Sequence, residues 1–253
     1  MKMLFAKTMA LAIGFMLVSV TFLGAAWAGE TLLSELDIEA SGSLDVYNRY
    51  VWRGFTLDTD PVVQPGFSLS GYGVTASFWG SWDADNNDAS NSDEVDFVVD
   101  YTKEFDDFSV SLGHTYYDFP GSSLYSREFY LGIAMSDFPL SPSLTYYHDY
   151  GDEDNGGGDG DYAVLSLSQG FDLVEEYGIT LDLGASVGYN HELFITGDGG
   201  DFLGSIGLTV PLTENLTMCP SVNYAVPFSD LSDSNDGNQD NRFYAGVSLG
   251  YSF

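Results

Sequence analysis

The chain has 253 residues, of which 38 are acidic and only 7 are basic, so its formal net charge is −31. A surface this acidic repels nucleic acid and excludes a basic membrane-binding face. Cys219 is the only cysteine of the sequence, which excludes an intrachain disulfide.

The first 28 residues have the pattern of a secretory signal peptide. Lys2 and Lys7 precede the apolar stretch Met9–Leu23, and Ala26-Trp27-Ala28 has the spacing of a cleavage site. The apolar stretch is nearly long enough for a membrane helix, but its basic start and small-residue end favour cleavage. We therefore predict that residues 1–28 are removed during export.

The rest of the chain, residues 29–253, is predicted to be a single domain. Residues 29–41 form a short periplasmic segment at its start, either a helix capped by Thr31 or a disordered lead-in. Downstream of residue 28, no window approaches the roughly 20 apolar residues that a spanning helix needs. If this part of the chain spans a membrane, it must do so as a closed barrel.

The segment Ile179–Asn190 alternates strictly between apolar and polar residues. Ile179, Leu181 and Leu183 are separated by polar or small residues, and the pattern continues to the end of the segment. In a helix these apolar residues would scatter around the axis, so only a strand gives them a common face. The same alternation recurs along the chain and predicts about twelve strands of roughly 10 residues, the length that a tilted strand needs to cross a bilayer.

In chain order, the predicted strands are Leu44–Arg53, Val63–Gly71, Val74–Trp82, Val95–Tyr101, Phe108–Tyr116, Phe129–Met135, Leu140–Tyr150, Ala163–Leu167, Ile179–Asn190, Phe202–Val210, Leu216–Tyr224 and Phe243–Phe253.

Short and long connections alternate between these strands. Turns such as Gly71–Gly73 and Pro211–Asn215 separate longer segments rich in Asp, Asn and Gly, such as Trp82–Asp93 and Pro227–Asp240. Short periplasmic turns opposite longer extracellular loops are typical of an outer-membrane barrel with both termini in the periplasm. We therefore predict an all-β fold, a transmembrane antiparallel up-and-down β-barrel of about 12 strands.

At the loop side of the barrel, the outward-facing positions nearest the loops are aromatic, as expected of an interfacial girdle. They are Trp52, Trp82, Tyr116, Tyr150, Tyr189, Tyr224 and Phe243. The alternative is a soluble lipocalin-like barrel, whose apolar residues would point inward. That alternative predicts the same period but no girdle.

Two segments carry a resemblance to known proteins. The last strand, Phe243–Phe253, ends in an aromatic residue and resembles the C-terminal strand of Gram-negative outer-membrane barrels. The segment Asp45–Gly54, followed by Pro61–Pro65, is similar to the first hairpin of a poorly characterised TorF-like group of proteobacterial outer-membrane proteins. Tyr50, Arg53, Gly54 and Gln64 carry that likeness. The resemblance implies a location in the cell outer membrane and insertion by the barrel assembly machinery, but no particular substrate.

The outward register places charged side chains in the lumen as pore-lining candidates. These are Arg49, Arg53, Arg242, Glu94, Asp96, Asp100, Glu128 and Asp182. Because the first and last strands meet when the barrel closes, Arg242 is expected near Arg53 at the loop end. Such a set allows two arrangements. A basic wall facing an acidic one would form a constriction that sorts polar solutes, whereas internal salt bridges would plug the barrel.

Small inward residues favour a channel, because they leave space in the last four strands. They are Gly184, Ser186, Gly188, Ser205, Gly207, Ser221, Gly246, Ser248 and Gly250. About twelve strands enclose more volume than eight strands can fill, yet less than a large porin does. Loops such as Trp82–Asp93 and Gly151–Gly160 are candidates for folding inward and closing the lumen.

A weak candidate metal site combines Asp83, Asp85, Asn87 and Glu94, which have the spacing of ligands in an EF-hand loop. Asp88 stands where that loop needs glycine, and no helices flank it. No cofactor is therefore predicted. Loose Ca²⁺ or Mg²⁺ bridging between acidic loops and lipopolysaccharide phosphates is favoured over a dedicated calcium site.

The histidines of the sequence do not predict a hydrolase. Of its three histidines, His114 and His148 are at positions that the alternation directs toward lipid, and Asp149 points away from its neighbour His148. No catalytic residue is predicted, and an outer-membrane hydrolase is the least favoured class. We expect a narrow porin-like channel for small hydrophilic solutes, surrounded by outer-membrane lipid and lipopolysaccharide. A non-conducting structural or surface-interaction barrel is the alternative.

Overall fold

The computed structural model describes residues 35–84, 93–237 and 239–253. The predicted signal peptide and residues 29–34 lie outside this range. Within it, none of the helices has both the length and the apolar character that crossing a membrane requires.

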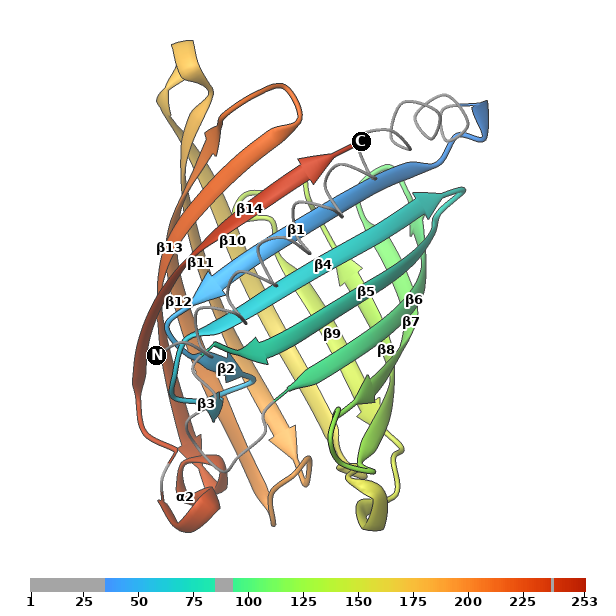
Figure 1. Cartoon of the computed structure of the whole chain (residues 1–253), viewed down its shortest axis with the longest axis vertical. Coiled ribbons are helices and arrows are strands. Elements are labelled where there is room, and N and C mark those ends of the chain that lie inside the picture. The colour runs from blue at the N-terminus through green and yellow to red at the C-terminus, as the bar shows by residue number, and fades with distance from the viewer. Residues whose placement is uncertain (1–34, 85–92, 238) are drawn as a thin grey trace, which may run out of the picture.

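The described residues form a closed antiparallel barrel of twelve strands (Figure 1). From β1, the order round the barrel is β14, β13, β12, β11, β10, β9, β8, β7, β6, β5 and β4, and β4 pairs again with β1. This confirms the predicted fold class.

The bounds of the barrel strands are β1 (Glu39–Tyr47), β4 (Val62–Gly71), β5 (Val74–Asp83), β6 (Glu94–Glu104), β7 (Ser109–Asp118), β8 (Tyr125–Ala134), β9 (Ser143–Asp149), β10 (Asp161–Val174), β11 (Ile179–His191), β12 (Asp198–Pro211), β13 (Leu216–Ser229) and β14 (Arg242–Ser252).

The alternation of each strand decides which side chains face outward. On β6, Phe97, Val99 and Tyr101 are 50 to 55% exposed, whereas Asp96 and Asp100, which alternate with them, lie on the inner face and are partly buried. Since side chains alternate along a strand, knowing which residues face outward also determines which residues face the lumen. The apolar set faces outward, as predicted, and not inward as in a lipocalin-like barrel.

Short connections lie at one end of the barrel and longer ones at the other, as predicted. The end near the C-terminus has turns such as Tyr72-Gly73 and the short helix η2 (Glu175–Tyr177) (Figure 1). The opposite end carries longer loops that contain η1 (Glu153–Asn155) and α2 (Asp230–Gly237). We call these the turn end and the loop end.

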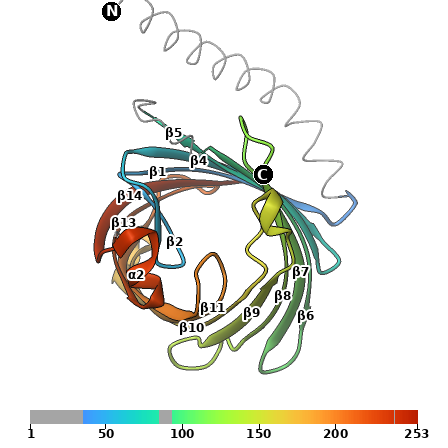
Figure 2. The ribbon, with the colours of Figure 1, turned by 90° about the horizontal axis from the view of Figure 1, so that it is seen from below.

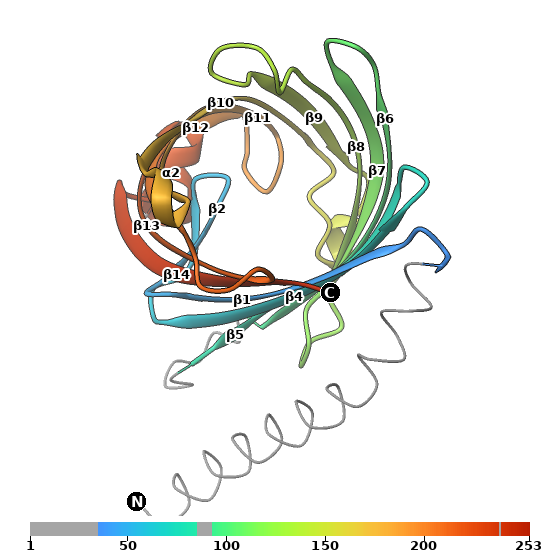
Figure 3. The same ribbon diagram turned by 90° about the horizontal axis from the view of Figure 1, so that it is seen from above.

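The first predicted strand, Leu44–Arg53, is wrong beyond Tyr47, where β1 ends. The chain bends at Asn48 and Arg49 and leaves the wall. It then forms a separate inner hairpin from β2 (Tyr50–Trp52) and β3 (Phe55–Asp58). Figures 2 and 3 show this hairpin inside the ring of strands. Trp52 therefore lies in the mouth of the barrel and not in the predicted outer girdle.

The turn of the inner hairpin consists of Arg53 and Gly54, with φ angles of 47° and 80°. Positive φ at both central residues is the geometry of a tight two-residue hairpin. A non-glycine residue adopts it at some cost, which surrounding contacts must offset. The contacts of Arg53 supply that offset.

Candidate functional site

The inner hairpin crosses the lumen. It is connected to β1, and its tip contacts β9, which is six strands from β1 in either direction round the barrel. Strands six apart in a closed set of twelve lie on opposite sides. The hairpin therefore reaches from one side of the mouth to the other.

Arg53, at the tip, forms a two-point ion pair with Glu128 of β8. Its Nη1 and Nη2 atoms donate to Oε1 and Oε2 at 2.6 and 2.9 Å. The side chains are 9% and 0% exposed. Burial alone lowers the pKa of the guanidinium, but the Glu128 carboxylate outweighs it and raises the pKa above the ordinary value. Arg53 therefore stays charged.

Aromatic rings surround the same guanidinium. Its central carbon lies 4.4 Å from the ring centre of Trp52, 4.1 Å from that of Tyr147 and 4.7 Å from that of Tyr162. Cation–π contacts strengthen when water is excluded. The rings and the carboxylate together make a site that fits arginine closely, since its planar fork can stack and bond at once.

Tyrosine hydroxyls complete the hydrogen bonding of the buried acids around the hairpin. Tyr117 donates to Glu128 at 2.6 Å, and Tyr162 donates to Asp201 at 2.8 Å. Within the hairpin, Tyr50 donates to Glu94 at 3.0 Å. Buried charges are tolerated when they are paired and hydrogen-bonded in this way.

Gly54 lets the tip approach the wall. A Cβ atom at this position would lie 2.7 Å from Cβ of Asp201 and 2.8 Å from a methyl group of Leu231 in α2. Leu231 is fully buried. The glycine is therefore required by its positive φ and by close contact with two different elements.

The predicted arginines do not form one wall. Arg49 lies in the bend after β1, and Arg242 begins β14, where its guanidinium bonds to Asp240 at 3.3 Å. The expected proximity of Arg53 to Arg242 is wrong, because the chain leaves the wall at Tyr47 and carries Arg53 across the lumen to Glu128.

The predicted acids lie on the inner face but at different depths. Glu94 and Glu128 are buried near the loop end. Asp96 follows Glu94 along β6, whereas Asp100 lies further toward the turn end and accepts from Thr102 at 3.3 Å. Asp182, on β11, accepts from Thr209 at 2.7 Å. The arrangement is a distribution along the lumen and not a single acidic wall.

Part of the space predicted from small residues is filled by tyrosines. Tyr162 lies over Gly188, and Tyr47 lies over Gly246, so closely that a Cβ on either glycine would overlap the ring. Aromatic rings packed over glycines are a recurrent way to cover bare sheet backbone. Toward the turn end the wall stays bare, since a Cβ at Gly250 would meet nothing within 4 Å.

Hydroxyl pairs line the turn end of the lumen. Ser41 and Ser68 lie 2.7 Å apart, Ser70 and Thr75 3.1 Å, and Thr102 and Ser111 2.7 Å, each pair across neighbouring strands. Small hydroxyls can hydrogen-bond to water and to polar solutes. This end of the lumen is therefore hydrophilic and free of bulky side chains at these positions.

A model of the family described as "Bacterial protein of unknown function (Gcw_chp)" matches residues 34–225. This chain belongs to that family. A search of curated proteins found no relative.

Two solved porins share its fold. The NanC porin is 13% identical with a TM-score of 0.52, over 84% of this chain and 98% of the other. The KdgM porin, solved in complex with disordered oligogalacturonate, is 16% identical with a TM-score of 0.53, over 85% and 99%. At these identities the likeness shows the fold of an outer-membrane barrel and carries no information about a solute.

The weak metal site falls partly outside the described residues, which exclude Asp85 and Asn87. Of the remaining two, Glu94 accepts a hydrogen bond from Tyr50 in the lumen. Within the described ranges, no three His, Cys, Asp or Glu side chains gather closely enough to hold a metal ion. The dedicated site therefore gains no support, and loose divalent-ion bridging stays a prediction.

His114 and His148 lie as the alternation predicts. His114 is on the outer face, where its Nε2 atom lies 2.6 Å from the Tyr150 hydroxyl. His148 contacts Asp161 on its own face at 2.9 Å, whereas Asp149 turns inward and accepts from backbone N–H groups of Gly151 and Gly158. None of these contacts joins a histidine to a serine.

Sequence reasoning missed the inner tyrosines and Asp201. The inward orientation of Tyr117, Tyr147 and Tyr162 could have been predicted from the alternation of each strand, because each of them neighbours an outward residue. Asp201 would have followed from extending the strand Phe202–Val210 by one residue. The hairpin had one signal, the Arg53-Gly54 pair between two short aromatic-containing runs, since glycine at such a point indicates a tight turn.

Proposed function

We propose that this chain is an exported protein of the cell outer membrane, inserted by the barrel assembly machinery and surrounded by lipid and lipopolysaccharide. Its outer face supports this, because large apolar side chains such as Leu112 on β7, Leu131 on β8 and Ile206 on β12 are more than half exposed. A continuous apolar surface of this kind needs a lipid environment. A relationship to the TorF-like group is part of the same proposal.

We propose further that it is a narrow channel for small hydrophilic solutes and that the inner hairpin closes its mouth. The observation that carries this is the hairpin itself, which crosses the lumen and is held by one buried ion pair, Arg53 with Glu128. Below it, the wall bears hydroxyls and glycine. Removing one partner of a buried pair costs about 3–5 kcal/mol, so the pair favours the closed state strongly.

Recording from planar bilayers tests the channel. The wild-type barrel should conduct rarely and in small steps, and Arg53→Ser should raise the open fraction and the step size several-fold, because it releases the hairpin and removes bulk. Arg242→Ser is the matched control, since Arg242 bonds to an exposed acid outside the hairpin. Acids dominate the lumen, so the open channel should prefer cations.

The second candidate is a non-conducting structural or surface-interaction barrel. The burial of the Arg53–Glu128 pair favours it, because a permanent plug would look the same. If neither the wild type nor Arg53→Ser conducts, in barrels shown to be folded, the result would contradict the channel proposal and support this candidate. An assay for lipid and peptide hydrolysis separates either from a hydrolase.

A further inference from the structure

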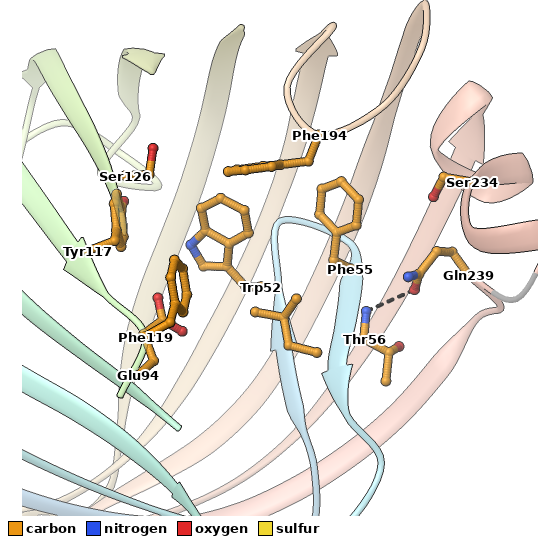
Figure 4. A pocket seen from close by; sticks show the side chains of 11 residues that line it. Trp52, Phe55, Thr56, Glu94, Tyr117, Phe119, Ser126, Phe194, Ser234 and Gln239 are labelled. Atoms are coloured by element: carbon orange, nitrogen blue, oxygen red, sulfur yellow. Dashed lines mark hydrogen bonds between the residues drawn. The ribbon is translucent and has the colours of Figure 1, made fainter. Parts of the chain in front are cut away.

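The loop end contains a cavity of about 390 Å³ beside the inner hairpin (Figure 4). Five aromatic residues from three parts of the chain line it. Trp52 and Phe55 come from the hairpin, Tyr117 and Phe119 from β7 and the residue after it, and Phe194 from the loop between β11 and β12. The volume falls within the range of small-molecule sites, which are typically concave and mostly apolar.

The rings pack against one another. The ring centres of Trp52 and Phe55 lie 6.1 Å apart, and those of Trp52 and Phe194 lie 6.0 Å apart at an interplanar angle of 62°. Gln239 fixes the position of the hairpin, because its side-chain oxygen accepts from the backbone N–H of Thr56 at 2.9 Å (Figure 4). The cavity is therefore held by contacts between separate elements, and no single loop forms it alone.

The lining of the cavity contains an acidic group and no basic one among the described residues. Among the described residues that line the cavity, Glu94 is the one acidic side chain, and none is a lysine or an arginine. Glu94 is 5% exposed and accepts a hydrogen bond from Tyr50. A buried carboxylate is stabilised by a nearby positive charge and destabilised by a negative one. An anionic ligand is therefore disfavoured.

We propose that this cavity binds a small organic cation, with its charged group over the aromatic rings near Glu94 and its apolar part against Trp52, Phe55 and Phe194. Aromatic faces attract cations, and several rings around one quaternary ammonium form a strong site. A metal ion is a poor fit, because it needs several oxygen ligands where this wall presents carbon. Arg53 already stacks on Trp52, and Glu128 neutralises its charge.

Binding can be measured whether or not the barrel conducts, so the two proposals fail separately. The probes are benzyltrimethylammonium, benzyl alcohol and benzenesulfonate, which share a ring and differ in charge. Calorimetric titration of the purified full-length mature barrel should show the cation binding about tenfold more tightly than the alcohol, with the sulfonate weakest. Equal binding of the cation and the alcohol would overturn the assignment of ligand class, and no binding of any probe would overturn the site.

Variants locate the site. Phe194→Ala should weaken the cation about tenfold, and Glu94→Gln should remove most of its advantage over the alcohol while keeping the shape of the side chain. Phe138→Ala, in a turn at the other end of the barrel, is the control and should bind as the wild type does. Binding that is unchanged in both Phe194→Ala and Glu94→Gln would place the cation elsewhere and contradict the proposal.

Discussion

The two halves of the lumen differ in the side chains that they contain. Toward the loop end, the inner hairpin, stacked tyrosines and the Arg53–Glu128 pair occupy the interior. Toward the turn end, hydroxyl pairs such as Ser41 with Ser68 lie on a wall with open space above Gly250. The inner hairpin and the wall side chains that hold its tip, Tyr147, Tyr162 and Glu128, thus account for the difference. The following predictions test whether that division holds.

The largest effect is expected from Arg53→Ala. Losing one partner of a buried ion pair costs roughly 3 kcal/mol or more, which corresponds to about a hundredfold change in the population of a released hairpin. Protease added to the barrel in lipid vesicles should therefore cut within residues 48–61 about a hundred times faster. Mass spectrometry of the fragments gives the position of the cut.

Arg242→Ala is the control for that experiment. Its guanidinium bonds to Asp240, which is mostly exposed, so its removal should leave the cutting rate nearly unchanged. Equal rates for Arg53→Ala and the wild type would mean that the ion pair does not hold the hairpin.

A second prediction concerns the wall. Leu183→Arg, on the lipid-facing side of β11, should lower the free energy of unfolding by about 2–4 kcal/mol. Leu183 is 38% exposed on the outer face. Ser186→Arg, on the inner face of the same strand, should be far milder. Reversible folding into lipid vesicles measures both, and equal costs would show that the inside and outside of the strand are assigned wrongly.

The smallest effect is expected from Gly54→Ala. The positive φ and the contact with Asp201 make an added methyl group unfavourable by about 1 kcal/mol or more, so hairpin cutting should rise several-fold. Gly250→Ala is matched to it, because a Cβ there meets nothing within 4 Å. Similar cutting rates in the two variants would contradict the close docking of the tip.

The wall of the barrel was predictable from the sequence because a strand has a period of two and each register fixes both faces. Asp96, Asp100, Glu128 and Asp182 lie inward as that period requires. The strands of greatest regularity, such as Ile179–Asn190, match β11 to within one residue. Alternation is a local property, and no distant contact is needed to read it.

The inner hairpin was not predictable in the same way. Tyr50 and Trp52 continue an alternating pattern, and no glycine or proline marks the bend at Asn48 and Arg49, so residues 44–53 resemble one strand. The partner of Arg53 lies 75 residues away, at Glu128. Only the three-dimensional closure of the barrel brings them together, and nothing in the local sequence of either residue specifies the other.

The most direct test is to remove the hairpin and keep the barrel. Tyr47 and Val62 are paired across β1 and β4, so residues 48–61 can be replaced by Asn-Gly, which favours a two-residue hairpin turn. If the hairpin closes a channel, this shortened barrel should fold and show frequent, large, cation-preferring conductance steps in planar bilayers, while the wild type stays mostly closed. A shortened barrel that folds and remains silent would contradict the account.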